Sequence, residues 1–178
     1  MSDLMTSASL RRLPLYEKHG EYGAKLGQFG SWEVPLYYSS ILEEHEAVRT
    51  RAGLFDISHM GKFFFDGQGA AAFLDSLLPR RIQKMREAEA LYMPLLNERG
   101  GILDDIILYR LGESRFLMIV NAANTEKDFR WIQSRLPCSA PFIFQDVSDE
   151  YGLLALQGPK SETILKQAFG AKSIPSLH

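Results

Sequence analysis

After residue 60, the chain alternates between short apolar runs and turn-forming segments rich in glycine, asparagine and charged residues. Short runs rich in β-branched and aromatic residues predict strands, whereas apolar residues recurring every three or four positions predict helices. We expect strands at Lys62–Asp66, Leu91–Leu96, Ile102–Leu111, Arg115–Asn121, Phe142–Val147 and Tyr151–Leu156. We expect helices at Ala70–Leu78, from Asn124 or Thr125 to Leu136, and after Gly158-Pro159.

From Lys62 to Val147 the expected order is β-α-β-β-β-α-β. Strands that follow one another through short turns, with helices between the runs, are typical of α+β proteins. We therefore predict a ferredoxin-like antiparallel sheet with helices on one face. The chain ends soon after its last expected helix, without a closing strand, so we expect it to be part of a larger fold.

The first third of the chain gives a weaker pattern. We expect residues 1–13 to be frayed and residues 14–38 to be irregular, with one short strand near Trp32–Leu36, because glycine and proline are frequent there. A helix should follow, with Ser40 as its N-cap and Glu43 completing a capping box. Ile41, His45, Val48 and Ala52 would share its apolar face, and Gly53 would end it.

The composition of the chain argues against several classes of function. The 178 residues are 46% hydrophobic and carry a net charge of −2, which gives no electrostatic basis for binding nucleic acid. No apolar stretch reaches the ~18 residues of a membrane span. The single cysteine, Cys138, excludes an internal disulfide and a cysteine-based zinc site, and it fits a cytoplasmic location best.

The strand at Ile102–Leu111 contains an unexpected pair, Asp104-Asp105, after the Gly100-Gly101 turn. Side chains alternate across a strand, so Asp105 should share a face with Leu103, Ile107 and Tyr109, and Asp104 should share one with Ile102, Ile106 and Leu108. At least one carboxylate should be partly buried, which requires a salt bridge, backbone donors or a ligand. Diverging acids without a nearby histidine do not favour a metal site.

Three other motifs have structural explanations. Gly67-x-Gly69-x-x-Ala72 follows a strand and opens a helix, but the hairpins after it do not fit a dinucleotide-binding crossover, so we interpret it as a tight turn. Gly158-Pro159-Lys160-Ser161 lacks the upstream glycine of a phosphate loop, and its proline removes an amide donor, so we interpret it as a helix start. His59 is interpreted as a hydrogen-bonded loop residue.

An ordered set of longer motifs points to a family. The motifs are Phe29-Gly30-Ser31-Trp32-Glu33-Val34-Pro35, Glu46-x-x-x-Arg49, Gly53-Leu54-Phe55-Asp56-Ile57-Ser58-His59-Met60-Gly61, Asn97-Glu98-x-Gly100-Gly101-Ile102-Leu103-Asp104-Asp105, Val120-Asn121-Ala122-Ala123-Asn124 and Ala155-Leu156-Gln157-Gly158-Pro159. From about Pro14 to Gly170 the chain resembles the N-terminal half of the T-protein family of the glycine cleavage system, the tetrahydrofolate-dependent aminomethyltransferases.

The resemblance implies a domain organisation. Residues 14–55 and 146–178 would be parts of a discontinuous first domain, incomplete here, and residues 56–145 would form the ferredoxin-like second domain. It also implies a site. Asp105 would be the catalytic aspartate, and the pterin pocket would be lined by Met60, Tyr92, Ile107, Tyr109, Ile119 and Asn121.

The reaction implied by the resemblance is transfer of a methylene unit from an aminomethyl-lipoyl group on the carrier H-protein to tetrahydrofolate, with release of ammonia. The expected partners are tetrahydrofolate and lipoylated H-protein, without a metal, nucleic acid or membrane. Two alternatives in the same superfamily stay open. One is a non-catalytic folate-binding protein linked to iron–sulfur maturation and tRNA modification, and the other is a folate-dependent demethylase.

Overall fold

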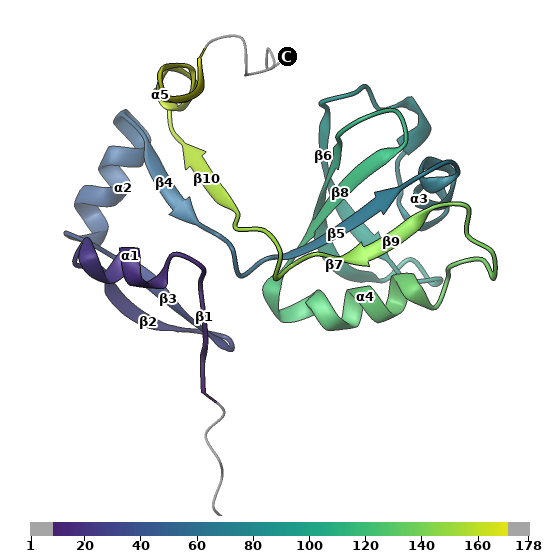
Figure 1. The fold of residues 1–178 in the computed structure, drawn as a ribbon, viewed down its shortest axis with the longest axis horizontal. Helices are drawn as coiled ribbons and strands as arrows, with labels where there is room; N and C mark the ends of the chain where they lie inside the picture. The colour runs from purple at the N-terminus through teal and green to yellow at the C-terminus, as the bar shows by residue number, and fades with distance from the viewer. Residues whose placement is uncertain (1–8, 171–178) are drawn as a thin grey trace, which may run out of the picture. The chain divides into compact units, whose positions relative to one another are not determined.

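The computed structural model describes residues 9–170, which fall into two compact units (Figure 1). One unit combines the chain up to Ile57 with the segment that starts at Leu154. The other is the continuous segment Ser58–Leu153. Residues 1–8, which we expected to be frayed, lie outside the described part.

The continuous unit is built on one five-stranded antiparallel sheet. Its elements are β5 (Gly61–Asp66), α3 (Ala70–Leu77), the 3-10 turn η1 (Ile82–Lys84), β6 (Ala90–Leu96), β7 (Ile102–Arg110), β8 (Arg115–Val120), the 3-10 turn η2 (Ala122–Asn124), α4 (Thr125–Gln133) and β9 (Ile143–Asp146). The strands lie in the order β6-β7-β8-β5-β9, and every neighbouring pair is antiparallel. When the edge strand β6 is left aside, the remaining elements follow the β-α-β-β-α-β order of ferredoxin-like folds. The predicted fold class is therefore confirmed.

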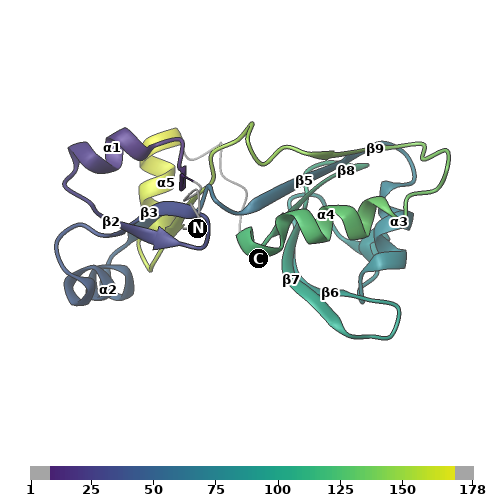
Figure 2. The ribbon, with the colours of Figure 1, turned by 90° about the horizontal axis from the view of Figure 1, so that it is seen from below.

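Alternation along the strands creates two different faces. Phe63, Phe65, Phe116 and Met118 are fully buried and belong to one core cluster. Side chains of α3 and α4, including Leu74 and Ile132, complete the same cluster, so both helices cover the same face of the sheet; they can be followed in Figure 2. The opposite face, called the open face below, carries the side chains of alternate residues that include Asp105, Ile107 and Tyr109.

A β-bulge at Leu103 interrupts this alternation. Leu95 of β6 pairs with Asp104, but Leu96 pairs with Ile102, so Leu103 is an extra residue in β7. Ile102 is 71% exposed, whereas Leu103 packs against the core cluster. The expectation that Leu103 would share the face of Asp105, and Ile102 that of Asp104, was therefore wrong. From Asp104 onward the predicted alternation holds.

The turn before this strand is closed by Asn97. Its Oδ1 accepts hydrogen bonds from the backbone N–H groups of Arg99 and Gly101, both at 2.9 Å. The backbone N–H of Gly100 donates to the carbonyl of Asn97, and Gly100 has φ of 78°. This left-handed conformation favours glycine at Gly100, and a Cβ at Gly101 would lie 2.7 Å from Asn97 Nδ2, so the turn itself explains both glycines without a phosphate or nucleotide.

The discontinuous unit contains more regular structure than we expected. Its elements are β1 (Arg11–Arg12), α1 (Tyr16–Glu21), β2 (Lys25–Phe29), β3 (Trp32–Tyr37), α2 (Ile41–Thr50), β4 (Gly53–Asp56), β10 (Leu154–Gln157) and α5 (Ser161–Phe169). The strand near Trp32–Leu36 is confirmed, but the irregular interpretation of residues 14–38 was wrong for α1 and β2. Gly27 does not interrupt β2. It allows the Leu36 side chain to pack closely against the strand, because a Cβ at position 27 would lie 2.4 Å from Leu36 Cδ1. Regular structure begins at Arg11, and Leu13 is buried.

Helix α2 begins where the capping residues predict. The Ser40 side chain accepts a hydrogen bond from the backbone N–H of Glu43. The return interaction comes from Glu44, not Glu43, since Glu44 Oε1 accepts from the N–H groups of Tyr38 and Ser39. No residue of α2 is buried: Ile41 is 68% exposed and Val48 is partly buried, so the predicted apolar face is only partly covered within the described residues.

The two glycine motifs are packing features. Gly67 has φ of 128°, and a Cβ there would lie 2.9 Å from the Cα of Phe142. Gly158 has φ of 114°, and a Cβ there would lie 2.5 Å from the carbonyl oxygen of Val48 at the end of α2. Both positions need glycine because of close backbone approach and φ, so the structural interpretation of both motifs is supported.

Candidate functional site

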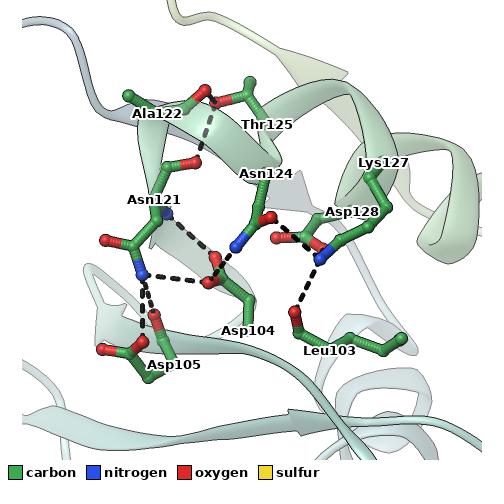
Figure 3. Close-up of polar contacts among 9 residues, drawn as sticks. All are labelled: Leu103, Asp104, Asp105, Asn121, Ala122, Asn124, Thr125, Lys127 and Asp128. Carbon is green, nitrogen blue, oxygen red and sulfur yellow. Dashed lines mark hydrogen bonds and ion pairs between the residues drawn. The ribbon is translucent and has the colours of Figure 1, made fainter. Parts of the chain in front are cut away.

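The two adjacent aspartates lie in opposite environments. Asp104 is 4% exposed and points toward the helix-covered face, whereas Asp105 is exposed on the open face (Figure 3). Both approach the same residue, Asn121, which follows β8. The pair therefore joins the interior of the continuous unit to its open face through one amide side chain.

Asp104 is an anchoring carboxylate. It accepts hydrogen bonds from the backbone N–H of Asn121 at 2.9 Å, from Asn121 Nδ2 at 2.9 Å and from Asn124 Nδ2 at 2.6 Å. Burial alone would raise the pKa of Asp104, but the hydrogen bonds from the side chain and backbone of Asn121 and from Asn124 oppose it, and that pKa is held below its usual value. Asp104 thus fixes the start of the segment that leads into α4.

Asp105 is held by two donors on the open face. Asn121 Nδ2 donates to its Oδ1 at 3.1 Å, and the Tyr92 hydroxyl donates to its Oδ2 at 2.9 Å. This hydrogen bond to Asp105 is the main cause that raises the pKa of the Tyr92 hydroxyl above its ordinary value. Tyr92 therefore remains a donor, and Asp105 is an oriented carboxylate directed away from the core.

The orientation of the Asn121 amide is set by these contacts. Nδ2 donates to Asp104 Oδ1, Asp105 Oδ1 and the Asp105 carbonyl. In Figure 3, the Oδ1 atom of Asn121 points away from this cluster, and it accepts no hydrogen bond from any residue between 9 and 170. The side chain therefore offers an acceptor to a ligand, whereas its donors are used internally.

The register of the sheet places the other predicted residues near this cluster. Ile107 of β7 is the Cα partner of both Tyr92 and Ile119. Tyr109 follows two positions later on the same face, and Ile119 is buried without belonging to the main core cluster. Met60 comes one position before the pair Gly61–Val120 of β5 and β8, at the end of the sheet where Asn121 also lies.

Sequence reasoning missed the residues behind the site, namely Asn124, Lys127 and Asp128 on η2 and α4. Lys127 Nζ donates to the Leu103 carbonyl at 2.6 Å and to Asn124 Oδ1 at 2.9 Å. Asp128 is completely buried. The sequence contains a signal for this buried polar cluster. Asn124, Asp128 and the core residue Ile132 follow one another at intervals of four positions, so the two polar residues lie on the side of the helix that faces the core.

Asp128 should make stability depend on pH. Burial first, and then the adjacent Asp104, raise its pKa from 3.8 to about 7. Between pH 5 and pH 7 the folded state then binds more protons than the unfolded state, so stability falls as pH rises, by about 2 kcal/mol. Asp104, whose pKa is lowered, acts in the opposite direction and only at pH values below this window.

The measurement is chemical unfolding of the chain and of Asp128→Asn at pH 5, 6 and 7. The variant has no titrating group at this position, so its stability relative to wild type should increase with pH. A constant difference between the two proteins across this range would contradict the shifted pKa.

None of the helices in the part of the chain that the structure describes is long and apolar enough to cross a membrane. Within residues 9–170, no three His, Cys, Asp or Glu side chains gather in a way that could hold a metal ion.

Comparison with known proteins supports the resemblance seen in the motifs. Residues 15–176 match the family described as the GCVT N-terminal domain. The chain is 48% identical to an aminomethyltransferase of Geobacillus kaustophilus and 46% identical to one of Geobacillus thermodenitrificans, over 158 residues in each case. These alignments cover 89% of this chain but 43% of each relative.

A solved structure shows the same relation. The glycine cleavage system aminomethyltransferase T from Bartonella henselae superposes with a TM-score of 0.84 at 42% identity, over 94% of this chain and 45% of that protein. The chain therefore spans less than half the length of the relatives it matches. The family match and these identities establish that the chain belongs to the aminomethyltransferase family of the glycine cleavage system, and that it carries the GCVT N-terminal domain of that family.

Proposed function

We propose that the chain is the folate-binding part of a tetrahydrofolate-dependent aminomethyltransferase, with Asp105 as its catalytic carboxylate. The observation that carries this proposal is the orientation of Asp105, which is held by Asn121 and Tyr92 on the open face above Ile107 and Tyr109. The two units of the fold would be parts of the family's first and second domains.

The open face has the chemistry that a reduced pterin requires. Side chains of Tyr92, Tyr109 and Ile107, with Met60 at the end of the sheet and the buried Ile119 paired with Ile107, would form an apolar surface for a flat ring. Asn121 Oδ1 offers an acceptor for an N–H group of the ring edge. Asp105 would then lie near the reacting nitrogen of tetrahydrofolate.

In the proposed reaction, the methylene carbon of the aminomethyl-lipoyl group forms bonds to two nitrogens of tetrahydrofolate. Its C–N bond breaks to release ammonia, its C–S bond breaks to release the lipoyl thiol, and the two N–H protons of tetrahydrofolate go to these leaving groups. The carbon becomes positively charged as the C–N bond to ammonia breaks. A fixed carboxylate stabilises that charge without reorganising during the reaction, because Tyr92 and Asn121 already hold it in place. The contribution of the chain is therefore positioning and electrostatic stabilisation.

The alternatives differ in what they require from Asp105. A non-catalytic folate-binding relative needs the open face but not an oriented carboxylate. The two hydrogen bonds on Asp105 therefore favour group transfer over binding alone. A folate-dependent demethylase would use the same open face with another one-carbon donor, and supplying aminomethyl-loaded H-protein separates these two reactions.

The first test is calorimetric titration of the chain with tetrahydrofolate. We expect saturable binding at one site, and about tenfold weaker binding by Asp105→Asn, because a hydrogen bond to a charged group is lost. Asp66→Asn is the matched control, since Asp66 is a partly exposed carboxylate at the other end of β5.

The same titration is run on a chimera in which residues 14–170 replace the matching segment of a full-length aminomethyltransferase. If neither protein binds tetrahydrofolate, the folate assignment is wrong. If Asp66→Asn weakens binding as much as Asp105→Asn does, the assignment of Asp105 is wrong.

A further inference from the structure

Asp128 has a setting that ordinary packing does not explain. It lies on α4 with no exposed surface, and neither carboxyl oxygen accepts a hydrogen bond from a residue of the described part. The nearest cation, Lys127 Nζ, is 3.7 Å from its Oδ1 and is already bonded to the Leu103 carbonyl and Asn124 Oδ1. A buried, ionised carboxylate without donors would be strongly destabilising.

The group beside Asp128 is Asp104, itself an acceptor for three N–H groups. Two ionised carboxylates cannot bond to each other, so contact between them requires a proton on one of them. Because the oxygens of Asp104 are occupied by N–H donors, the proton belongs on Asp128. The charged groups that act on Asp128 are Asp104 from β7 and Lys127 from its own helix.

We propose that Asp128 is a positioning residue: a proton on its carboxyl group bonds it to Asp104 and so fixes the Asn121 amide with Oδ1 directed to the open face. Loss of that proton places two negative charges side by side and releases the hold of Asp104 on Asn121. The site then loses its oriented acceptor for an N–H group of the ligand. The part that concerns the ligand rests on the proposed folate function.

The electrostatics place this transition in the physiological range. Burial and the neighbouring Asp104 raise the pKa of Asp128 to about 7, whereas Lys127 only partly opposes the shift. Asp128 therefore changes its charge near neutral pH, where few side chains other than histidine do so. The acceptor geometry at Asn121 should follow the same titration.

The direct test observes the Asn121 side-chain amide by NMR in the chain between pH 5.5 and 8.5. We expect its Nδ2 resonances to shift with a midpoint near 7, together with the carboxyl carbon of Asp128. Asp128→Asn supplies a permanent donor to Asp104, so it should keep the low-pH position of the Asn121 resonances throughout. Asp66→Asn should titrate as the wild type does. Asn121 resonances in wild type that do not change with pH would overturn the proposal, even if the variant failed to fold.

The second readout is tetrahydrofolate affinity over the same range. Wild type should bind severalfold more weakly at pH 8.5 than at pH 6, whereas Asp128→Asn should lose that dependence. A wild-type Kd that is constant with pH would overturn the role of Asp128 in binding. If no protein binds tetrahydrofolate but Asn121 still titrates with Asp128, the proposed function fails while the positioning of Asn121 by Asp128 is supported.

Discussion

Replacing Asp104 with alanine should lower the free energy of unfolding of the Ser58–Leu153 unit by about 3 kcal/mol. The substitution leaves the backbone N–H of Asn121 and the Nδ2 group of Asn124 without their buried acceptor. Asp105→Ala, one residue later, should cost less than about 1 kcal/mol because Asp105 is exposed.

The neighbouring aspartates form a matched pair for this experiment. The chain has two tryptophans, Trp32 in one unit and Trp131 in the other, so a Trp32→Phe background lets fluorescence of Trp131 follow the continuous unit alone. Denaturant unfolding of both alanine variants then gives the difference directly. Equal destabilisation by the two substitutions would show that Asp104 is not an anchor.

Replacing Asp105 with asparagine should reduce methylene transfer about 100-fold, in line with the loss of one oriented electrostatic group. Asparagine keeps the shape of the side chain and an oxygen for the Tyr92 hydroxyl, but it lacks the charge that would stabilise the positive carbon. The assay measures methylenetetrahydrofolate formed from aminomethyl-loaded H-protein by the chimera described above. An active wild-type chimera is the required reference.

The same assay includes two controls. Asp66→Asn should keep the wild-type rate, because Asp66 interacts with Arg115 at the far end of the strand. Tyr92→Phe should give a smaller loss than Asp105→Asn, since it removes only one of the two donors to the carboxylate. Unchanged turnover by Asp105→Asn would exclude the catalytic role assigned to it.

Local sequence patterns were enough to distinguish the two aspartates in principle. Alternation assigned Asp105 to the face of Ile107 and Tyr109, and the structure has that arrangement. The bulge at Leu103 could not be predicted in this way, because it depends on pairing with Leu95 and Leu96 of the neighbouring strand. Each strand of the ferredoxin-like sheet has a strongly apolar side. This pattern predicts which residues face the core, and it also predicts approximately where each strand begins and ends.

Other features depended on tertiary contacts. The role of Asp128 arises from Asp104, which is 24 positions away in sequence and belongs to another element. In the discontinuous unit, α1 carries His19, whose ring nitrogens contact the Tyr38 hydroxyl at 2.7 Å and Asp56 Oδ2 at 2.9 Å. The two partners come from two other segments of the chain, so the short helix is stabilised by contacts that the glycine-rich local sequence does not reveal.

On the open face, Tyr92, Asp105 and Asn121 form a polar cluster whose side-chain donors are all used in hydrogen bonds within the protein. Tyr92 uses its hydroxyl proton on Asp105, and Asn121 uses its amide protons on the two aspartates. The groups of Tyr92, Asp105 and Asn121 that stay available on the outer side are therefore oxygen lone pairs, which can only accept hydrogen bonds. A molecule that binds there must supply every proton of the hydrogen bonds it makes with them, so this cluster selects for ligands rich in N–H groups or positive charge and disfavours phosphate and other anions.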